Sequence, residues 1–287
     1  MRYTIFPGCL ISYRFPEYEK SARLVLKKLG LELIDIDTFS CCGSQILESI
    51  DLNKIFLLNA RNIAIAQKND IDTIITLCGS CTHILKSCLK SYNDISIVDN
   101  LNQKLFKLNL ELNDTHKIRV FHFFEFLNIS NIFEKFKKYI IKKIKINVVL
   151  QNPCMVFRPF RVSNLTLQDR KYISKLLLEC GLNVLHYKYT NRCCGGTLLA
   201  FEESVARELG KLRYNALAQS KADMIVVSCP NCQLMYSVYQ NLLNDQCIPS
   251  VFLPQILGLA MGFSFNSVGL DRNINNDNIE EILKDYL

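Results

Sequence analysis

Short runs of apolar and β-branched residues alternate with longer amphipathic segments along most of this 287-residue chain. In the first third, apolar runs at 2–6, 31–36 and 72–77 predict strands. The amphipathic segments between them, at 16–30 and 51–68, predict helices. Strands that alternate with helices of this length indicate parallel βαβ crossovers.

The same order of elements recurs in the second half. Apolar runs at 146–151, 183–188 and 224–228 predict strands, and the segments 167–179 and 203–220 predict helices. The pattern therefore predicts an α/β protein built from two duplicated βαβαβ-type units with parallel sheets and flanking helices. We expect a first unit, a connecting helical segment, a second unit and a C-terminal tail at residues 1–100, 101–145, 146–270 and 271–287.

Two segments leave alternatives open. Residues 134–145 carry six Lys and one Glu at helical spacing, which fits a solvated helix packed on the core or a helix facing a membrane or acidic partner. Residues 246–270 carry no charge, but the helix-breaking prolines and glycines among them argue against a spanning helix. We expect a buried C-terminal helix starting near Pro254, with a membrane-docking surface as the alternative.

The cysteine content is the feature of the composition that most restricts the function of the protein. The chain has 49% hydrophobic and 21% charged residues and a mild net charge of +7, with no arginine-rich tract that would predict a nucleic-acid partner. It has no glycine-rich phosphate loop, so we expect no nucleotide. Thirteen cysteines are far above ordinary usage, and the opening MRYTIFPGCL lacks the apolar stretch of a signal peptide. We therefore expect a cytoplasmic protein whose thiols serve metal binding or redox chemistry.

Ten of the thirteen cysteines form a repeat of the pattern C…CC…CxxC. Intervening lengths are 31 and 35 residues in the first copy and 38 and 34 in the second, so matching positions lie 145, 152 and 151 residues apart. The first set consists of Cys9, Cys41, Cys42, Cys78 and Cys81, and the second set of Cys154, Cys193, Cys194, Cys229 and Cys232. Three cysteines fall outside the repeat, and we interpret them as small buried apolar residues: Cys88, Cys180 and Cys247.

Each set is predicted to converge, because its cysteines follow predicted strands and open α/β sheets gather ligands at the carboxyl ends of their strands. Five thiols exceed the four ligands of tetrahedral zinc, and an adjacent cysteine pair suits one small ion poorly. Iron–sulfur clusters accept thiolates on several iron atoms. We favour iron–sulfur clusters, with zinc in one or both units and structural disulfides as alternatives.

The cysteine pattern resembles the paired cysteine-rich CCG domains found in the B subunits of heterodisulfide reductases. The resemblance covers almost the whole chain. It includes the segments YTIFPGC, NARNIAIA, TLCGSC, HFFEFL, IVVSCPNCQLMY and PQILGLAMG.

The resemblance implies two non-cubane [4Fe-4S] clusters, one held by each set, that reduce a disulfide between them, such as the coenzyme M–coenzyme B heterodisulfide. It implies catalytic roles for Cys41, Cys42, Cys193 and Cys194. It also implies two partners, a ferredoxin-like iron–sulfur protein (the C subunit) and a flavin-bearing protein (the A subunit). Membrane association would then come through partners.

The substrate and the direction of electron flow stay open. The chain has Gly43-Ser44 where methanogen relatives often have proline, and it differs from them around Cys154. Related chains serve quinone-linked succinate or fumarate dehydrogenases and sulfur-oxidising complexes in electron transfer or anchoring, and a zinc-stabilised scaffold is a third possibility. Three arginines are candidates to hold an anionic tail or are surface residues, namely Arg158, Arg161 and Arg192. Three histidines are interpreted as core or surface residues, namely His83, His122 and His186.

Overall fold

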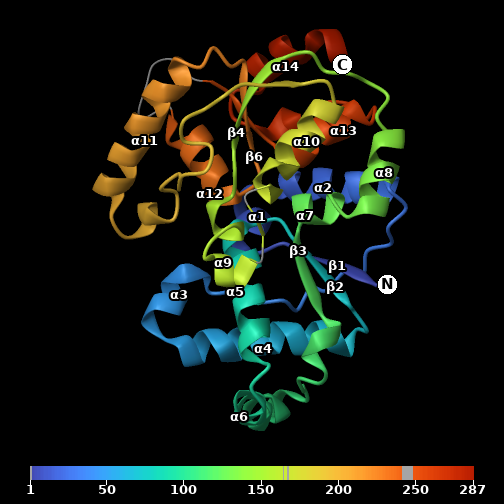
Figure 1. The fold of residues 1–287 in the computed structure, drawn as a ribbon, viewed down its shortest axis with the longest axis vertical. Helices are drawn as coiled ribbons and strands as arrows, with labels where there is room; N and C mark the ends of the chain where they lie inside the picture. Colours follow the sequence, from blue (N-terminus) through green and yellow to red (C-terminus); the bar gives the residue numbers. More distant parts are fainter. Residues whose placement is uncertain (1, 164, 167, 241–247) are drawn as a thin grey trace.

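The strands of the protein form two parallel sheets in a computed structural model that describes residues 2–163, 165–166, 168–240 and 248–287 (Figure 1). The side chains of residues 160 and 161 lie outside this description. The first sheet has the order β1-β2-β3, with strands Tyr3–Phe6, Thr73–Thr76 and Arg119–His122. The second has the order β5-β4-β6-β7, with strands Asn183–Val184, Asn147–Gln151, Met224–Val227 and Ser250–Phe252. The predicted α/β architecture of duplicated parallel units is confirmed.

Helices flank both sheets. Those of the first half are α1 (Cys9–Arg14), α2 (Pro16–Lys28), α3 (Ser44–Ile50), α4 (Leu52–Lys68), α5 (Gly79–Ser91), α6 (Ile95–Leu105), α7 (Phe123–Leu127) and α8 (Ser130–Lys138). Those of the second half are α9 (Phe160–Ser163), α10 (Tyr172–Glu179), α11 (Glu203–Ala218), α12 (Pro230–Gln233), α13 (Leu253–Ala260) and α14 (Asn276–Leu283).

Local sequence signals set the ends of the long helices. Helix α2 begins at Pro16, whose missing N–H needs no partner in the first turn. Glu19 in its first turn and Lys28 in its last complement the helix dipole, and Gly30 with φ +75° follows its end. Helix α4 is capped by Asp51, whose side chain accepts a hydrogen bond from the Lys54 N–H at 3.0 Å.

The two halves pack against each other through α2 and α13, which lie side by side (Figure 1). The ring of Tyr18 on α2 stacks on Phe252 with centroids 4.0 Å apart, and Phe15 meets the same ring edge-on at 5.5 Å. All three rings are buried. This aromatic contact fixes the carboxyl edge of one sheet relative to that of the other.

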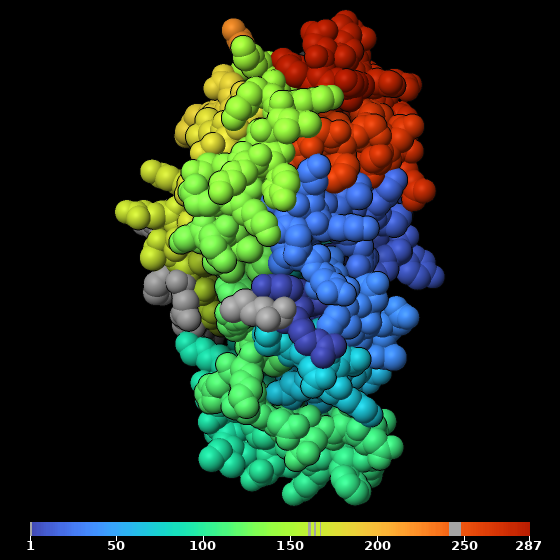
Figure 2. Space-filling view, turned by 90° about the vertical axis from the view of Figure 1, so that its right-hand side faces the viewer, coloured from blue at the N-terminus to red at the C-terminus, as the bar shows by residue number. Residues whose placement is uncertain are grey.

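The connecting segment differs from its prediction as a helix over 134–145. Helix α8 ends at Lys138, because the backbone beyond it bonds elsewhere. The N–H groups of Ile141 and Lys142 donate to the Ala260 carbonyl at 2.9 and 3.0 Å. The N–H of Ile144 donates to the Cys180 carbonyl at 2.8 Å. In Figure 2 this light-green segment runs along the surface beside the blue α2 region and the red C-terminal elements.

Three further predicted elements are shorter than expected. Residues 31–36 form no strand; Leu33 makes one isolated bridge to Tyr3. The strand predicted over 183–188 is only two residues long, Asn183–Val184. Within 167–179 the α-helix starts at Tyr172, after a 3-10 turn at Asp169–Lys171.

Two edge strands complete the sheets and are absent from the prediction. β3 lies within the connecting segment and pairs with β2, and β7 pairs with β6. Each is followed at once by a helix whose third residue accepts a hydrogen bond from the strand's last N–H: Glu125 from His122 at 2.6 Å, and Gln255 from Phe252 at 2.9 Å. The duplication therefore extends to a strand–helix unit at the edge of each sheet.

The uncharged segment near the C-terminus contains α13, which begins at Leu253 and is buried along its whole length. The predicted buried helix near Pro254 is confirmed for the described residues 248–270. Across the parts of the chain that the structure describes, no helix has both the length and the apolar character needed to cross a membrane.

Candidate functional site

The repeated cysteines lie where the two sheets present the carboxyl ends of their strands. In each sheet one strand leads into a lone cysteine, and another leads into a CxxC motif at the start of a short turn or helix. The four cysteines that follow β1, β2, β4 and β6 are Cys9, Cys78, Cys154 and Cys229. Because the strands are parallel, these cysteines lie at the same edge of their sheets, as the sequence predicts.

The first set forms a connected group of sulfur atoms. The Sγ atoms of Cys9 and Cys41 are 3.5 Å apart, and those of Cys42 and Cys81 are 3.3 Å apart. Cys41 interacts with Cys42, and Cys81 with Cys78. The five thiols that are distant in sequence are therefore brought together.

The second set repeats this connectivity. Cys193 interacts with both Cys154 and Cys194, and Cys232 interacts with both Cys194 and Cys229. Each contact has its counterpart in the first set at the position given by the sequence repeat.

The two sets also lie next to each other, which the sequence repeat does not reveal. The thiol of Cys78 interacts with that of Cys229, and the N–H of Gly79 donates to Cys229. Helix α5 starts directly against the second half, since a Cβ on Gly79 would lie 3.3 Å from the side chain of Pro153. The ten sulfurs therefore form one continuous array with the order Cys9, Cys41, Cys42, Cys81, Cys78, Cys229, Cys232, Cys194, Cys193 and Cys154.

The crowding of thiols separates their pKa values within each set. Hydrogen bonds from Cys42 and Cys9 lower the pKa of Cys41 to about 2, and the hydrogen bond to Cys41 raises the pKa of Cys42 to about 12. In the second set, Cys154 and Cys194 lower the pKa of Cys193 to about 2 in the same way. Each set thus favours a thiolate at the first cysteine of its adjacent pair, and the thiolate is the form that binds metals.

Glycines hold the adjacent pairs in tight turns. Gly43 and Gly195 adopt φ values of +87° and +90°, which other residues rarely adopt. The N–H of Gly43 donates to Cys41 Sγ at 3.3 Å, and that of Gly195 to Cys193 Sγ at 3.4 Å. These backbone donors stabilise sulfur that carries negative charge.

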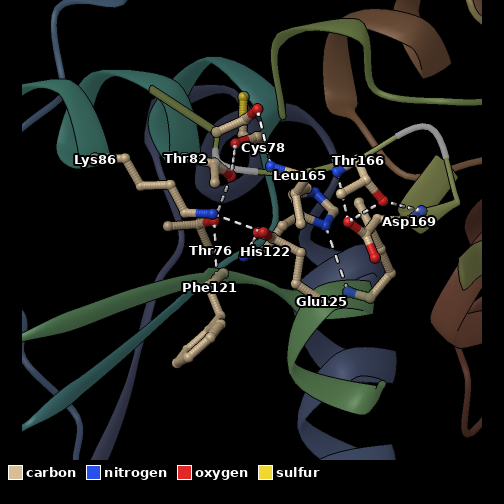
Figure 3. Close-up of polar contacts among 12 residues, drawn as sticks. Thr76, Cys78, Thr82, Lys86, Phe121, His122, Glu125, Leu165, Thr166 and Asp169 are labelled. Atoms are coloured by element: carbon tan, nitrogen blue, oxygen red, sulfur yellow. Dashed lines mark hydrogen bonds and ion pairs between the residues drawn. The ribbon is translucent and has the colours of Figure 1, made fainter. Parts of the chain in front are cut away.

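A buried polar network anchors the first CxxC motif (Figure 3). Thr82 on α5 donates to the Cys78 carbonyl at 2.9 Å and lies 2.6 Å from the Thr76 hydroxyl on β2. Lys86, one turn further along α5, pairs with the buried Glu125 at 2.6 Å, and Glu125 in turn accepts from the His122 N–H. The network fixes the start of α5 relative to β2 and β3.

A cavity of about 350 Å³ opens onto the first set. All five first-set cysteines line it, together with Leu10 and Ile46 from the first half and Leu199, Ala200 and Leu234 from the second. No Lys, Arg, His, Asp or Glu is among the described residues that line it. The cavity therefore joins the first-set thiols to an apolar chamber built by both halves.

The arginines predicted to hold an anionic tail lie outside this cavity. Arg158 is exposed and donates to the Asn191 carbonyl at 3.1 Å, and Arg192 is exposed beside the second set. The side chain of Arg161 falls outside what the structure describes. Substrate contact by these three arginines stays a prediction.

A different arginine lies near the second set. Arg213 on α11 is only 4% exposed, its Nη1 donates to the Leu209 carbonyl at 2.6 Å, and its guanidinium carbon lies 5.4 Å from the centre of the Tyr189 ring. Its charge contributes to the lowered pKa of Cys193. The repeat offset of 151 places Arg213 opposite Asn62, which bonds the backbone N–H of Ser40 at 2.9 Å, next to the first cysteine pair. An alignment of the two halves could have found this residue.

The remaining candidates from the sequence have structural positions. His122 is fully buried, and burial lowers its pKa to about 3; His83 is buried and contacts Glu48 at 3.3 Å; His186 is exposed. These positions place two of the histidines in the core and one at the surface, and that none of them is a ligand stays a prediction. Cys88 and Cys180 are buried as predicted, and Cys247 lies outside the described residues.

The comparisons with known proteins agree with the cysteine geometry. A family model described as the cysteine-rich domain CCG matches residues 3–86 and 148–237, which contain all ten repeated cysteines. The chain belongs to the CCG cysteine-rich domain family. The two matched segments correspond to the duplicated units seen in the structure.

Its relatives include subunits of reductases. The chain is 28% identical over 293 residues to the B subunit of the ferredoxin:CoB-CoM heterodisulfide reductase of Methanosarcina mazei, covering 99% of this chain and 96% of the relative. It is 26% identical over 278 residues to the 8-methylmenaquinol:fumarate reductase membrane anchor subunit of Wolinella succinogenes, covering 95% and 96%. The resemblance to the heterodisulfide reductase B subunits stated from the sequence is confirmed.

Among solved structures, a hypothetical protein from Helicobacter pylori shares the fold. The TM-score is 0.74 at 19% identity, and the match covers 95% of this chain and 51% of that chain. At this identity the likeness supports the fold alone.

Proposed function

We propose that this protein is the iron–sulfur subunit of a heterodisulfide reductase-like complex and reduces a disulfide between two cluster sites. The observation that carries the proposal is the continuous array of ten sulfurs, in which the contact between Cys78 and Cys229 joins two sets of five. Two redox centres held this close could deliver one electron each to the two halves of one substrate.

Each set fits one [4Fe-4S] cluster by the chemistry of its donors. Five thiols belong to each site, more than one zinc ion uses, and an iron–sulfur cluster can accept thiolates on several iron atoms. The first set would hold one non-cubane cluster and the second set the other, with zinc in one unit as the alternative. Cys41, Cys42, Cys193 and Cys194 are the thiols nearest the chemistry in this proposal.

The reaction consumes two electrons and two protons: R–S–S–R′ + 2e⁻ + 2H⁺ → RSH + R′SH. The electrons come from two partners in the complex, a ferredoxin-like C subunit that carries iron–sulfur clusters, together with a flavin-bearing A subunit. Iron–sulfur clusters supply one-electron transfer and iron sites for sulfur. The chain's own residues position the two sets, and the apolar cavity walls exclude water from the disulfide.

A second candidate is an electron-transfer or anchoring subunit of a quinone-linked succinate or fumarate dehydrogenase. The relative in Wolinella succinogenes favours it, because that protein is named as a membrane anchor subunit. We propose a cytoplasmic location, with any membrane association made through partners. Reduction of a disulfide, with no reduction or oxidation of a quinone, by the cluster-loaded protein separates the two candidates.

Cys88 and Cys180 lie outside the sulfur array, and both are buried in the apolar core. Replacing either one by alanine is expected to leave the iron content unchanged and to lower the free energy of unfolding by about 1 kcal/mol through lost packing. Iron analysis and denaturant unfolding measure the two effects. Loss of iron in either variant would show that the ligand set extends beyond the repeat.

Arg213 distinguishes the second set from the first electrostatically. We expect Arg213→Gln to lower the reduction potential of the second cluster, because a buried positive charge nearby favours the added electron. Potentiometric titration followed by EPR measures this, and Arg213→Lys should restore most of the wild-type value. The matched control is Arg207→Gln, which removes an exposed arginine of the same helix. An unchanged potential in Arg213→Gln would contradict this role.

A further inference from the structure

The cavity beside the first set is lined by apolar side chains as well as by the thiols. Beyond the thiols, most of its apolar side chains come from α1, α3, the segment 197–200, and α12 with Leu234 directly after it. A cluster held by the first-set thiols would occupy the part of the cavity that the cysteines line. We call the part lined by Leu10, Ile46 and Leu199 the outer cavity, and a substrate would lie there.

The two sets differ in the exposure of their cysteines and in whether these cysteines line the chamber. Cys9 and Cys41 are exposed, whereas Cys154 and Cys193, their counterparts, are partly buried and do not line it. Gly196 stands where the first half has Ser44. A Cβ on Gly196 would come within 2.2 Å of the Asn231 carbonyl oxygen, so the second loop is closed against α12. A substrate therefore approaches from the side of the first set.

Among its described lining residues, the chamber offers no cationic partner for an anionic substrate. The polar side chains among its described lining residues are neutral, such as Ser44, Ser80, Thr197 and Asn231. Arg158 and Arg192 are exposed outside the cavity, and Arg213 is buried beside the second set. An ionised sulfonate, phosphate or carboxylate would lose its hydration here without gaining an opposite charge, which is strongly unfavourable.

From this lining we infer that the substrate is a neutral, apolar disulfide that binds in the outer cavity against the first-set thiols. The inference rests on the proposed disulfide reduction and deepens it by naming the substrate class. Neutral hydroxyl and amide groups of the lining can still orient a neutral polar tail, for example an amide, by hydrogen bonds.

A matched pair of probes tests the inference: lipoamide and lipoate carry the same dithiolane ring and differ in a neutral amide against a carboxylate. Each is titrated at pH 7.5 into the anaerobic, cluster-loaded protein, and binding is followed by the change in the EPR and visible spectra, without turnover. We expect lipoamide to bind at least tenfold more tightly than lipoate.

One variant should remove the preference for lipoamide. Leu199→Lys places a cation in the cavity wall, so lipoate should gain at least tenfold in affinity relative to lipoamide. Leu212→Lys is the control: Leu212 is 51% exposed on α11 and absent from the lining, so the same added charge should leave the preference unchanged.

The outcomes separate the inference from the function it rests on. Equal binding of the two probes, tighter binding of lipoate, or an unchanged preference in Leu199→Lys would overturn the neutral-substrate inference and leave disulfide reduction standing. If neither disulfide perturbed the clusters while a neutral menaquinone analogue did, the proposed disulfide chemistry itself would fail.

Discussion

Serine in place of Cys42 is expected to remove about half of the iron, about four atoms of eight per chain, and to leave the second set loaded. Cys42 is buried and lies between Cys41 and Cys81 in the sulfur array, so its loss interrupts the first set at its centre. A hydroxyl is a poor substitute for thiolate as an iron ligand. Iron and sulfide analysis of the anaerobically purified variant measures the loss.

The duplication provides the matched variant. Cys194 occupies the same place in the second set, between Cys193 and Cys232, so Cys194→Ser should remove the other half of the iron. EPR spectra should show complementary signals for the two variants. Full iron in both variants would mean that the thiols at the centre of each set are not ligands.

The second large effect concerns turnover. Either variant alone is expected to lose disulfide reduction by at least a thousandfold, although its surviving cluster can still be reduced. Cleavage to two thiols needs two electrons, and one cluster supplies one. The nearness of Cys78 and Cys229 supports the proposal that the two sets act on one substrate.

The assay is anaerobic reduction of a disulfide by the chemically reduced protein, with thiol release as the readout. A control variant, Cys180→Ala, keeps both sets and should retain wild-type activity. Turnover at the wild-type rate by a protein with one cluster would refute the two-site mechanism and favour a simple electron relay.

Much of the site could be predicted from the sequence because cysteine spacing survives duplication. The CxxC motifs follow the buried strands β2 and β6, whose apolar runs are clear, and the strand ends then determine where the thiols gather. The repeat also identified Cys88 and Cys180 as core residues. These conclusions need only local pattern and the geometry of parallel sheets.

Other features depend on packing that local pattern does not encode. Strand β3 has four residues, too few for its alternation to stand out, and β2 recruits it. The apolar run 31–36 lacks strand partners beyond one bridge because the first sheet is completed by β3 instead. The nearness of the two sets depends on the packing of the two halves, in which Tyr18 of α2 stacks on Phe252 of β7.

The position of the arginines relative to the second set could not be predicted from the local sequence either. Arg158 and Arg192 are near the second set in sequence but are exposed, whereas Arg213, 20 residues after Cys193, is buried beside it. Helix α11 packs next to the second cysteine pair, since a Cβ on Gly195 would lie 3.5 Å from Leu209 of this helix. Nearness in sequence was a poor guide here because the helix brings a later residue back to the thiols.

We propose that the ten thiols hold two iron–sulfur clusters, and analysis of iron, acid-labile sulfide and zinc in the anaerobically purified wild-type protein tests this directly. We expect about eight iron and eight sulfide per chain and almost no zinc. One or two zinc ions per chain with no sulfide and no visible absorbance would contradict it, and would identify the sulfur array as a structural metal scaffold.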